Sequence, residues 1–364
     1  MSNEKIKILK MLENGEITTD EAMKLLSVIE GNFSTNTTYN SNNNNNNSNN
    51  GSSISIDFNK IKNKISKTTN ILAQKTSKIY SGVEKEVKNI FKNINTNYTK
   101  SSSVKEFNFS LNETENTLNL KALNGETVLK GYNGDKLTLK VIYIPKQQDA
   151  DIQFYYLENK EYSLKFKEEL FEKISIEALI PKKYFKNISL NLINSNFLLD
   201  SLNFQNIFCE TTKCNGIIEN SDGQNINVNN INGKIIVRNI KADKLKICNI
   251  NDYVKLNNID IKEVFVDVLN GEIDVVNDYL NSFDSYNWNL ETQSNPINIE
   301  INTDNVFYNI DATASVGKIN ILKNNLVYTE KTDYKVVAKT EDINPDFKSL
   351  NLYLETANST IILS

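Results

Sequence analysis

A 19-residue interval governs the middle of this 364-residue sequence. Residues 231–240 read INGKIIVRNI, residues 250–259 read INDYVKLNNI, and residues 269–278 read LNGEIDVVND. Two apolar columns keep the same interval: Ile188, Ile207, Ile226, Leu245 and Val264, and then Leu190, Cys209, Val228, Ile247 and Val266. A fixed period of this size, with two strand-like stretches in each period, is typical of a β-solenoid, in which each coil stacks on the next.

Asparagine recurs at two further sets of positions with this interval. One set is Asn232, Asn251 and Asn270, and the other is Asn239, Asn258 and Asn277. Asparagine tolerates the left-handed backbone of a tight corner, and its amide can bond to the amide of the next coil. We therefore predict a β-solenoid or β-helix-like domain of ~19-residue coils, with two short strands per coil and structural, Asn-rich corners.

The regular interval is lost on both sides of residues 188–278. Residues 103–180 alternate like strands without the period, and we expect them to cap the N-terminal end of the stack as a sandwich-like sheet. Shorter apolar stretches return at 296–302, 316–322, 334–339 and 358–364. They predict terminal strands or coils with longer loops, so that residues 101–364 form one mainly β domain.

Residues 1–31 carry the pattern of a helical hairpin. Gly15 ends the first helix, and Thr18 with Glu21 forms a capping box at the start of the second. Two short helices bury little apolar area, so this hairpin is expected to self-associate or to dock on a partner. Residues 32–53 are almost entirely Asn, Ser and Thr, a composition that predicts a disordered linker.

Residues 54–100 predict a basic amphipathic helix, because apolar residues recur there at three- and four-residue steps. Its candidate contact residues for a membrane or a partner are Lys60, Lys62, Lys64, Lys67, Lys75, Lys78, Lys85, Lys88 and Lys92. Two interpretations stay open. The helix can lie on an anionic membrane surface, or its apolar stripe can pack against the acidic body or in a coiled coil. No motif supports nucleic-acid binding.

Charge separates the two parts of the chain. Residues 1–100 carry 14 Lys and 9 acidic residues, a net charge of +5, whereas residues 101–364 carry 27 Lys plus Arg and 36 acidic residues, a net charge of −9. The sum is the net charge of −4 for the whole chain. This asymmetry indicates that the two parts meet different partners.

The residue types present argue against an enzyme. The chain has no histidine, which removes Ser–His and Cys–His activation and His-ligated zinc. Its three cysteines, Cys209, Cys214 and Cys248, have neither C-x-x-C spacing nor an even number, so we expect buried structural thiols. The aligned columns contain no carboxylate pair of the kind that a carbohydrate-active β-helix enzyme would use. We expect no catalytic residue, cofactor or metal.

The N-terminal residues are charged and lack the apolar core of a secretory signal, and no run of about 18 apolar residues occurs. These features predict a cytoplasmic protein that can sit peripherally at the inner membrane face.

Two stretches carry a family resemblance. LENGEITTDEA, residues 12–22, resembles the small SHOCT-like helical module of bacterial proteins. KISIEALIPKKYFKNISLNLINSNFLLDSL, residues 173–202, with the following N-G-x-I-x-V coils, resembles the bacterial putative-adhesin family of β-strand-repeat proteins, a domain of unknown function. The order of hairpin, linker and β domain is similar to that of LiaX/YvlB-type proteins of Firmicutes. The resemblance implies no catalytic residues and a link to envelope-stress responses.

These observations predict a non-enzymatic scaffold or regulatory protein of the bacterial envelope-stress response. Its partner would be an unidentified protein or the membrane surface, with self-association through the hairpin and no nucleic acid. The alternative is a surface adhesin-like binding module, which would require export. A carbohydrate-active enzyme is the third and weakest interpretation.

Overall fold

The computed structural model describes residues 102–157, 159–341 and 346–364. The predicted hairpin 1–31, the linker 32–53 and the basic segment 54–100 lie outside the described residues.

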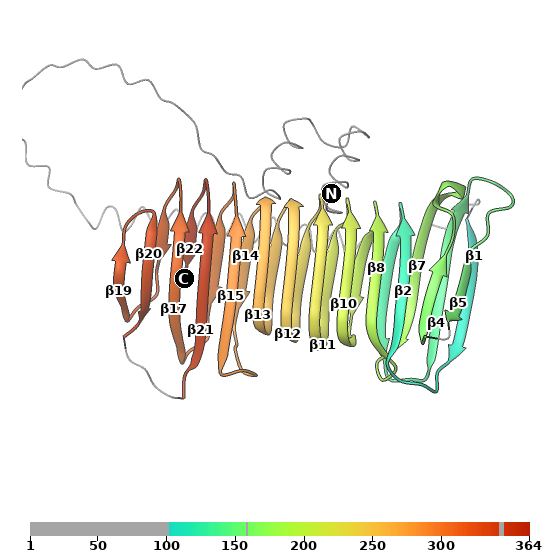
Figure 1. The fold of residues 1–364 in the computed structure, drawn as a ribbon, viewed down its shortest axis with the longest axis horizontal. Coiled ribbons are helices and arrows are strands. Elements are labelled where there is room, and N and C mark those ends of the chain that lie inside the picture. The colour runs from blue at the N-terminus through green and yellow to red at the C-terminus, as the bar shows by residue number, and fades with distance from the viewer. Residues whose placement is uncertain (1–101, 158, 342–345) are drawn as a thin grey trace, which may run out of the picture. The chain divides into compact units, whose positions relative to one another are not determined.

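The described residues are mainly β, as predicted, with 22 strands in one hydrogen-bonded sheet and one short 3₁₀ helix, η1 (Glu168–Leu170) (Figure 1). The first strands are β1 (Ser103–Ser110), β2 (Asn116–Leu123), β3 (Glu126–Tyr132), β4 (Lys136–Pro145), β5 (Gln153–Leu157), β6 (Glu161–Lys165) and β7 (Phe171–Pro181). The middle strands are β8 (Phe185–Ile193), β9 (Asn196–Asp200), β10 (Asn203–Thr212), β11 (Gly216–Ile231), β12 (Ile235–Asn251), β13 (Val254–Asn270) and β14 (Ile273–Asn277). The last strands are β15 (Ser285–Thr292), β16 (Ile297–Ile301), β17 (Val306–Ala314), β18 (Ile319–Ile321), β19 (Leu326–Lys331), β20 (Lys335–Thr340), β21 (Lys348–Thr356) and β22 (Ile361–Leu363).

The middle strands pair in parallel, and each is shifted against the next by one sequence repeat. Ile207 lies between Ile188 and Ile226, and Leu245 lies between Ile226 and Val264. All five side chains are buried. The predicted interval and its inward-facing column are therefore confirmed as the register of the sheet.

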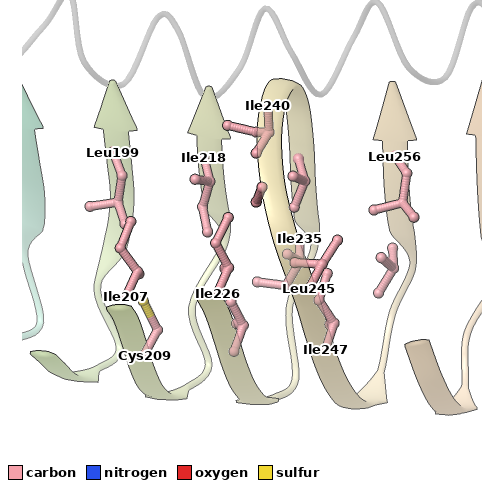
Figure 2. Close-up of a cluster of buried hydrophobic side chains, with 14 of the residues drawn as sticks. Leu199, Ile207, Cys209, Ile218, Ile226, Ile235, Ile240, Leu245, Ile247 and Leu256 are labelled. Atoms are coloured by element: carbon pink, nitrogen blue, oxygen red, sulfur yellow. The ribbon is translucent and has the colours of Figure 1, made fainter. Parts of the chain in front are cut away.

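Each coil has two sides. The outward residues of β2, β8, β10, β15, β21, β17 and the second halves of β11–β13 form what we call the long-strand face. The outward residues of β3, β9, β14, β16, β22, β18 and the first residues of β11–β13 form the short-strand face. Figure 2 shows the core between them, with Leu199, Ile218 and Leu245 among the buried side chains of successive coils.

The prediction of two separate short strands per coil is wrong in the middle of the stack. There β11, β12 and β13 span 16, 17 and 17 residues, and each passes through a corner into the next coil. At each of these corners one residue has a left-handed backbone, namely Asn220, Asn239 or Asn258, with φ of 52°, 51° and 50°. Strand pairing continues on both sides of that residue. Each of these strands therefore begins on the short-strand side, turns at the corner and continues on the long-strand side.

Asparagine amides stack at both corners of these coils, as expected. Asn239 Nδ2 donates to Asn220 Oδ1 at 3.0 Å, and Asn270 Nδ2 donates to Asn251 Oδ1 at 3.0 Å. Inside the stack a second ladder runs unexpectedly through the buried Asn230 and Asn249, joined at 3.1 Å. Their amides also donate to the carbonyl of Gly233 at 2.8 and 3.0 Å, so the buried polar groups are satisfied.

The N-terminal region is only partly a cap. Strands β2 and β3 form a coil that stacks in parallel on β8 and β9, with Leu118 beside Ile188, and β6 and β7 stack in parallel on β2 and β3. Strands β5, β4 and β1 then close this end by antiparallel pairing. The expected sandwich-like sheet is thus replaced by two further coils and antiparallel closing strands.

The C-terminal coils are out of sequence order. Strands β21 and β22 at the chain end lie between the coil β15–β16 and the coil β17–β18, and pair in parallel with both (Figure 1). The antiparallel hairpin β19–β20 closes this end by pairing with β17. The apolar stretches at 296–302, 316–322 and 358–364 are coil strands, and the one at 334–339 is a closing strand.

Gly233 should not tolerate a side chain. Its φ is +146°, and an added Cβ would lie 2.2 Å from the backbone oxygen of Cys214 in the neighbouring coil. We expect Gly233→Ala to lower the free energy of unfolding by about 2 kcal/mol or more, as strained backbone and close contact add. Chemical denaturation would measure the change. The control is Lys213→Gly at the corner one coil earlier, where φ is +56° and the loss should be absent.

Candidate interaction surfaces

The nine lysines predicted to contact a membrane or partner lie outside the described residues. The described part of the chain has other surfaces, which no sequence motif predicted. They are built by repetition, because each strand position recurs once per coil and side chains from successive coils stand about 4.8 Å apart.

One of these surfaces, which we call the polar ladder, runs along the long-strand face. Its members share one register column, and most of them touch the next through a hydrogen bond or an ion pair. They are Thr117, Asn187, Asn206, Asn225, Lys244, Glu263, Asn287, Asn351 and Asn309. Asn206 donates to Asn187 at 2.8 Å, Asn225 to Asn206 at 3.0 Å, and Lys244 pairs with Glu263 at 3.2 Å.

The ladder continues past the irregular loop at 278–284. Asn351 Nδ2 donates to Asn287 Oδ1 at 2.8 Å, and Asn309 Nδ2 donates to Asn351 Oδ1 at 3.3 Å. The out-of-order C-terminal coils therefore extend the same polar line. Three-dimensional register, rather than sequence spacing, makes the ladder continuous, and the sequence analysis did not predict it.

Two further columns run parallel to the ladder on the same face, two and four residues further along each strand. The first contains Phe208, Asn227, Lys246, Phe265, Asn289 and Tyr353. Lys246 Nζ lies 5.7 Å from the centre of the Phe265 ring, and Tyr353 is 52% exposed. The second column brings Asp267, Glu291 and Glu355 together in consecutive coils, and among the described residues no Lys or Arg forms an ion pair with them.

Asp267 carries an electrostatic cost at neutral pH. Burial raises the pKa of its carboxyl, and Glu291 raises it further, while Lys246 opposes the shift. A raised folded-state pKa contributes stability below the unfolded-state pKa of about 3.9, and that stability is lost as pH rises through the folded-state value. We therefore expect Asp267→Asn to raise the Tm at pH 7 by a few °C and to leave it unchanged near pH 3.

Thermal unfolding of both proteins at the two pH values would measure this effect. Glu330→Gln, on the exposed strand β19, is the control and should change neither Tm. Equal gains for Asp267→Asn at pH 3 and pH 7 would contradict a titration effect.

A buried carboxylate organises the loop 278–284. Asp260 is 4% exposed and accepts hydrogen bonds from Tyr286 Oη at 2.6 Å, from Ser282 Oγ at 2.6 Å, and from the backbone N–H of Ser282 at 3.1 Å and of Asn281 at 3.3 Å. Burial and the bond to Asp260 raise the pKa of Tyr286, so its phenol remains a donor at neutral pH. These hydrogen bonds tie the loop to the coil beneath it, which gives Asp260 a structural role.

The three cysteine thiols are in surroundings that disfavour the reactive thiolate. Cys209 and Cys214 are buried as predicted, whereas Cys248 is half-buried. Burial raises the pKa of all three, which opposes formation of the reactive thiolate. Within the described ranges no group of three or more Cys, Asp or Glu is placed to hold a metal ion.

Two open hollows lie at the ends of the stack. One, of about 360 Å³, is lined by Ile319, Tyr328, Asp333 and neighbouring residues, and the other, of about 400 Å³, by Asp149, Asp151, Lys165 and neighbouring residues. Asp151 already pairs with Lys105 at 2.9 Å. In the part of the chain that the structure covers, no helix is both long and apolar enough to cross a membrane.

Comparison with solved structures finds several matches at low identity. A putative adhesin from Bacteroides fragilis is 12% identical, with 73% of this chain and 98% of that chain covered and a TM-score of 0.42. A putative lipid binding protein from Parabacteroides distasonis is 11% identical, with 73% and 98% covered and a TM-score of 0.38. A putative cell adhesion protein from Clostridium sporogenes is 14% identical, with 72% and 99% covered and a TM-score of 0.27.

Comparison with curated proteins finds no match. Two family models match the sequence itself. A SHOCT-like domain model matches residues 3–33, in agreement with the resemblance of the predicted hairpin. The Toastrack DUF4097 model matches residues 155–344, which is more than half of the chain and includes the regular coils. The chain therefore belongs to the Toastrack DUF4097 family.

Proposed function

We propose that this protein is a non-enzymatic β-solenoid scaffold that binds an elongated protein partner along its long-strand face. The observation that carries the proposal is the polar ladder, which places amide and charged groups in one line from Thr117 to Asn309. A repeated, flat row of this kind suits a partner that lies along the stack and contacts several coils at once.

The chemistry of the two columns beside the ladder indicates which class of partner fits this face. Phe265 and Tyr353 offer aromatic contact area, which protein interfaces favour. Asp267, Glu291 and Glu355 provide a strip of three carboxylates, which attracts a basic segment and opposes a polyanion. The partner that fits is therefore a protein with an extended, lysine- or arginine-rich segment.

Photo-crosslinking in cells tests this proposal. A photoreactive amino acid would replace Asn225 or Tyr353 on the long-strand face, and Lys130, exposed on the short-strand face, as the control. We expect one discrete crosslinked product from the first two positions and none from Lys130. No product at the ladder positions, or the same products at all three, would overturn the proposal.

The competing proposal is that the protein contacts a membrane through the lysines between Lys60 and Lys92. Flotation with anionic vesicles distinguishes the two, since binding that requires these lysines and ignores the ladder would favour the membrane. The cytoplasmic location and the envelope-stress role inferred from the family resemblance belong to the same proposal. Protease treatment of intact cells tests the adhesin-like alternative, because an adhesin is cleaved under these conditions and a cytoplasmic scaffold is protected.

A further inference from the structure

The two ends of the stack finish in edge strands of different kinds (Figure 1). At the C-terminal end, β19 pairs with β20 across a register shift between Tyr328 and Glu330, and Lys331 Nζ lies 4.0 Å from the centre of the Tyr328 ring. A bulge and a charged side chain are devices that keep an edge strand from pairing with another chain. At the N-terminal end, β1 pairs with β4 over eight residues without a register shift. The end strands β5, β18 and β19 have only 5, 3 and 6 residues, so β1 is the most regular edge that the described stack offers.

The side of β1 that faces away from β4 carries backbone donors and acceptors at alternate residues. In an antiparallel pair, residues that exchange hydrogen bonds with the partner strand alternate with residues whose N–H and C=O point away from it. The N–H of Leu111 donates to the carbonyl of Asp135 at 2.8 Å, which fixes this alternation along β1. The residues whose backbone groups point to the open side are Val104, Glu106, Asn108 and Ser110. Within the described ranges β1 pairs with no strand other than β4, so these groups can receive one further strand.

Aromatic side chains form the layer that ends the stack beside this edge. The rings of Phe107 and Phe109 in β1 each lie 5.5 Å from the ring of Phe154 in β5, centre to centre. Tyr156 of β5 packs on Tyr162 at 4.9 Å, yet it is 42% exposed. Phe107 and Phe109 are only half-buried. The end of the stack therefore presents partly exposed aromatic surface directly beside the open edge of β1.

One charged side chain, Lys105, points inward from β1, and it is already paired. Its ammonium donates to Asp151 Oδ1 at 2.9 Å and to the carbonyl of Ile152 at 2.7 Å. An inward-pointing lysine protects an edge most effectively when approach of another chain would bury its charge without a counter-ion. Because Asp151 supplies that counter-ion, Lys105 does not prevent another strand from pairing with β1.

We propose that β1 pairs antiparallel with β1 of a second copy of this chain, so that two stacks meet at their N-terminal ends about a two-fold axis. The residues that exchange hydrogen bonds across the axis must be those whose backbone groups point to the open side. One register that meets this condition uses the whole strand. It places Val104 opposite Ser110, Glu106 opposite Asn108, and Phe107 opposite Phe107 of the second copy. Its hydrogen-bonded pairs supply about eight backbone hydrogen bonds.

Charge and hydrogen bonding favour a second copy in this register. A shift by two residues would place Glu106 opposite Glu106, and like charges directly opposite each other destabilise a strand pair. In the proposed register each Glu106 instead meets Asn108. The Oδ1 atom of Asn108 accepts a hydrogen bond from Thr138 Oγ1 on β4 at 3.0 Å, so its NH₂ group lies on the side away from β4 and can donate to the Glu106 carboxylate. The same pairing stacks the two aromatic layers, since Phe107 meets its own equivalent.

This association goes beyond the proposed partner binding and does not use the long-strand face. A two-fold axis perpendicular to the sheet at β1 leaves the outward direction of that sheet unchanged. The long-strand faces of both copies would therefore lie on the same side of the dimer, and one partner could contact both.

Sedimentation velocity of the full-length protein over a dilution series tests the dimer. We expect a species of about twice the chain mass of 41.5 kDa. Asn108→Glu should raise the Kd of the dimer at least tenfold above that of Asn108→Lys, because the first variant opposes the Glu106 carboxylate of the other copy with a like charge and the second with an opposite charge. Both variants lose the same bond to Thr138, so an effect on folding alone would be equal in the two. Equal Kd values for the two variants would contradict the proposed register.

Glu106→Pro provides a second, independent variant. It removes one N–H group on the open side of β1, where an edge strand tolerates proline, so we expect a folded monomer. The control Glu106→Ala keeps that N–H group and should keep the dimer. Phe107→Cys should form an intermolecular disulfide on oxidation, since equivalent residues of a non-hydrogen-bonded pair lie about 4.5 Å apart at Cα, whereas Val327→Cys on β19 should give no more than the wild-type background.

Two results would overturn the proposal. A wild-type chain that stays monomeric throughout the dilution series would leave the edge of β1 to a strand of a different protein. A dimer that persists in Glu106→Pro would assign self-association to another part of the chain, such as the predicted helical hairpin 1–31.

Discussion

Removal of residues 348–364 is expected to unfold the C-terminal end of the stack. This segment contains β21 and β22, which stand between the coil β15–β16 and the coil β17–β18. Within the described residues, β18 pairs only with β22, and β17 reaches the rest of the stack only through β21. Truncation therefore detaches everything from Val306 to Thr340.

The size of the effect follows from the core that leaves with the segment. Leu350, Leu352, Leu354, Ile361 and Leu363 are all at most 2% exposed. Each contributes about 1.5–3 kcal/mol by burial, against a total stability of about 5–15 kcal/mol for an ordinary domain. Circular dichroism should show loss of strand signal, and limited proteolysis should cut within residues 306–340. The control Tyr353→Ala, in the same strand but 52% exposed, should unfold like the wild type. A truncated protein with intact strands and unchanged protease resistance would refute this order of coils.

Asp260→Ala is expected to lower the free energy of unfolding by about 3–5 kcal/mol, because several buried donors lose one shared acceptor. Without the carboxylate, four donors lose their acceptor. They are the hydroxyls of Tyr286 and Ser282 and the backbone N–H groups of Ser282 and Asn281. Each buried donor without a partner costs about 1–3 kcal/mol, although the loop can relax to rehydrate some of them. Tyr286, which is fully buried and packs against Phe283 of this loop, would lose part of its cover.

Equilibrium denaturation measures this loss, and hydrogen exchange localises it to residues 278–288. Asp284→Ala is the matched control, since Asp284 follows the same loop but its side chain is fully exposed and pairs only with Lys348 at 3.0 Å. The control should be as stable as the wild type. If Asp260→Ala proves as stable as Asp284→Ala, the network does not hold the loop.

The regular part of the fold was readable from the sequence because one physical constraint repeats there. Ile207, Ile226 and Leu245 must each face the core at the same point of successive coils, and this leaves a fixed period in the sequence. The corner role of Asn239 and Asn258 was equally visible, since the left-handed backbone limits the choice of residue.

The order of the end coils and the buried polar groups could not be predicted from the sequence, because they depend on contacts between distant parts of the chain. Leu118 pairs with Ile188, which lies 70 residues later in the chain. Leu352 pairs with Ile310, although its strand comes later in the sequence and stacks before that of Ile310. Neither pairing leaves a local signal in the sequence. Asp260 looks like any surface carboxylate until the loop 278–284 folds over it. The buried Asn230 and Asn249 resemble corner asparagines in sequence, and only the register places them inside.

The constant register of β10 to β13 has a consequence for how such a chain can change during evolution. Every coil there offers its neighbours the same inward column and the same corner, so an in-frame duplication or deletion of one whole repeat leaves both closing ends unaltered. A shift by a single residue would instead turn core side chains outward. The number of coils, and with it the length of the long-strand face, can therefore vary in steps of one coil.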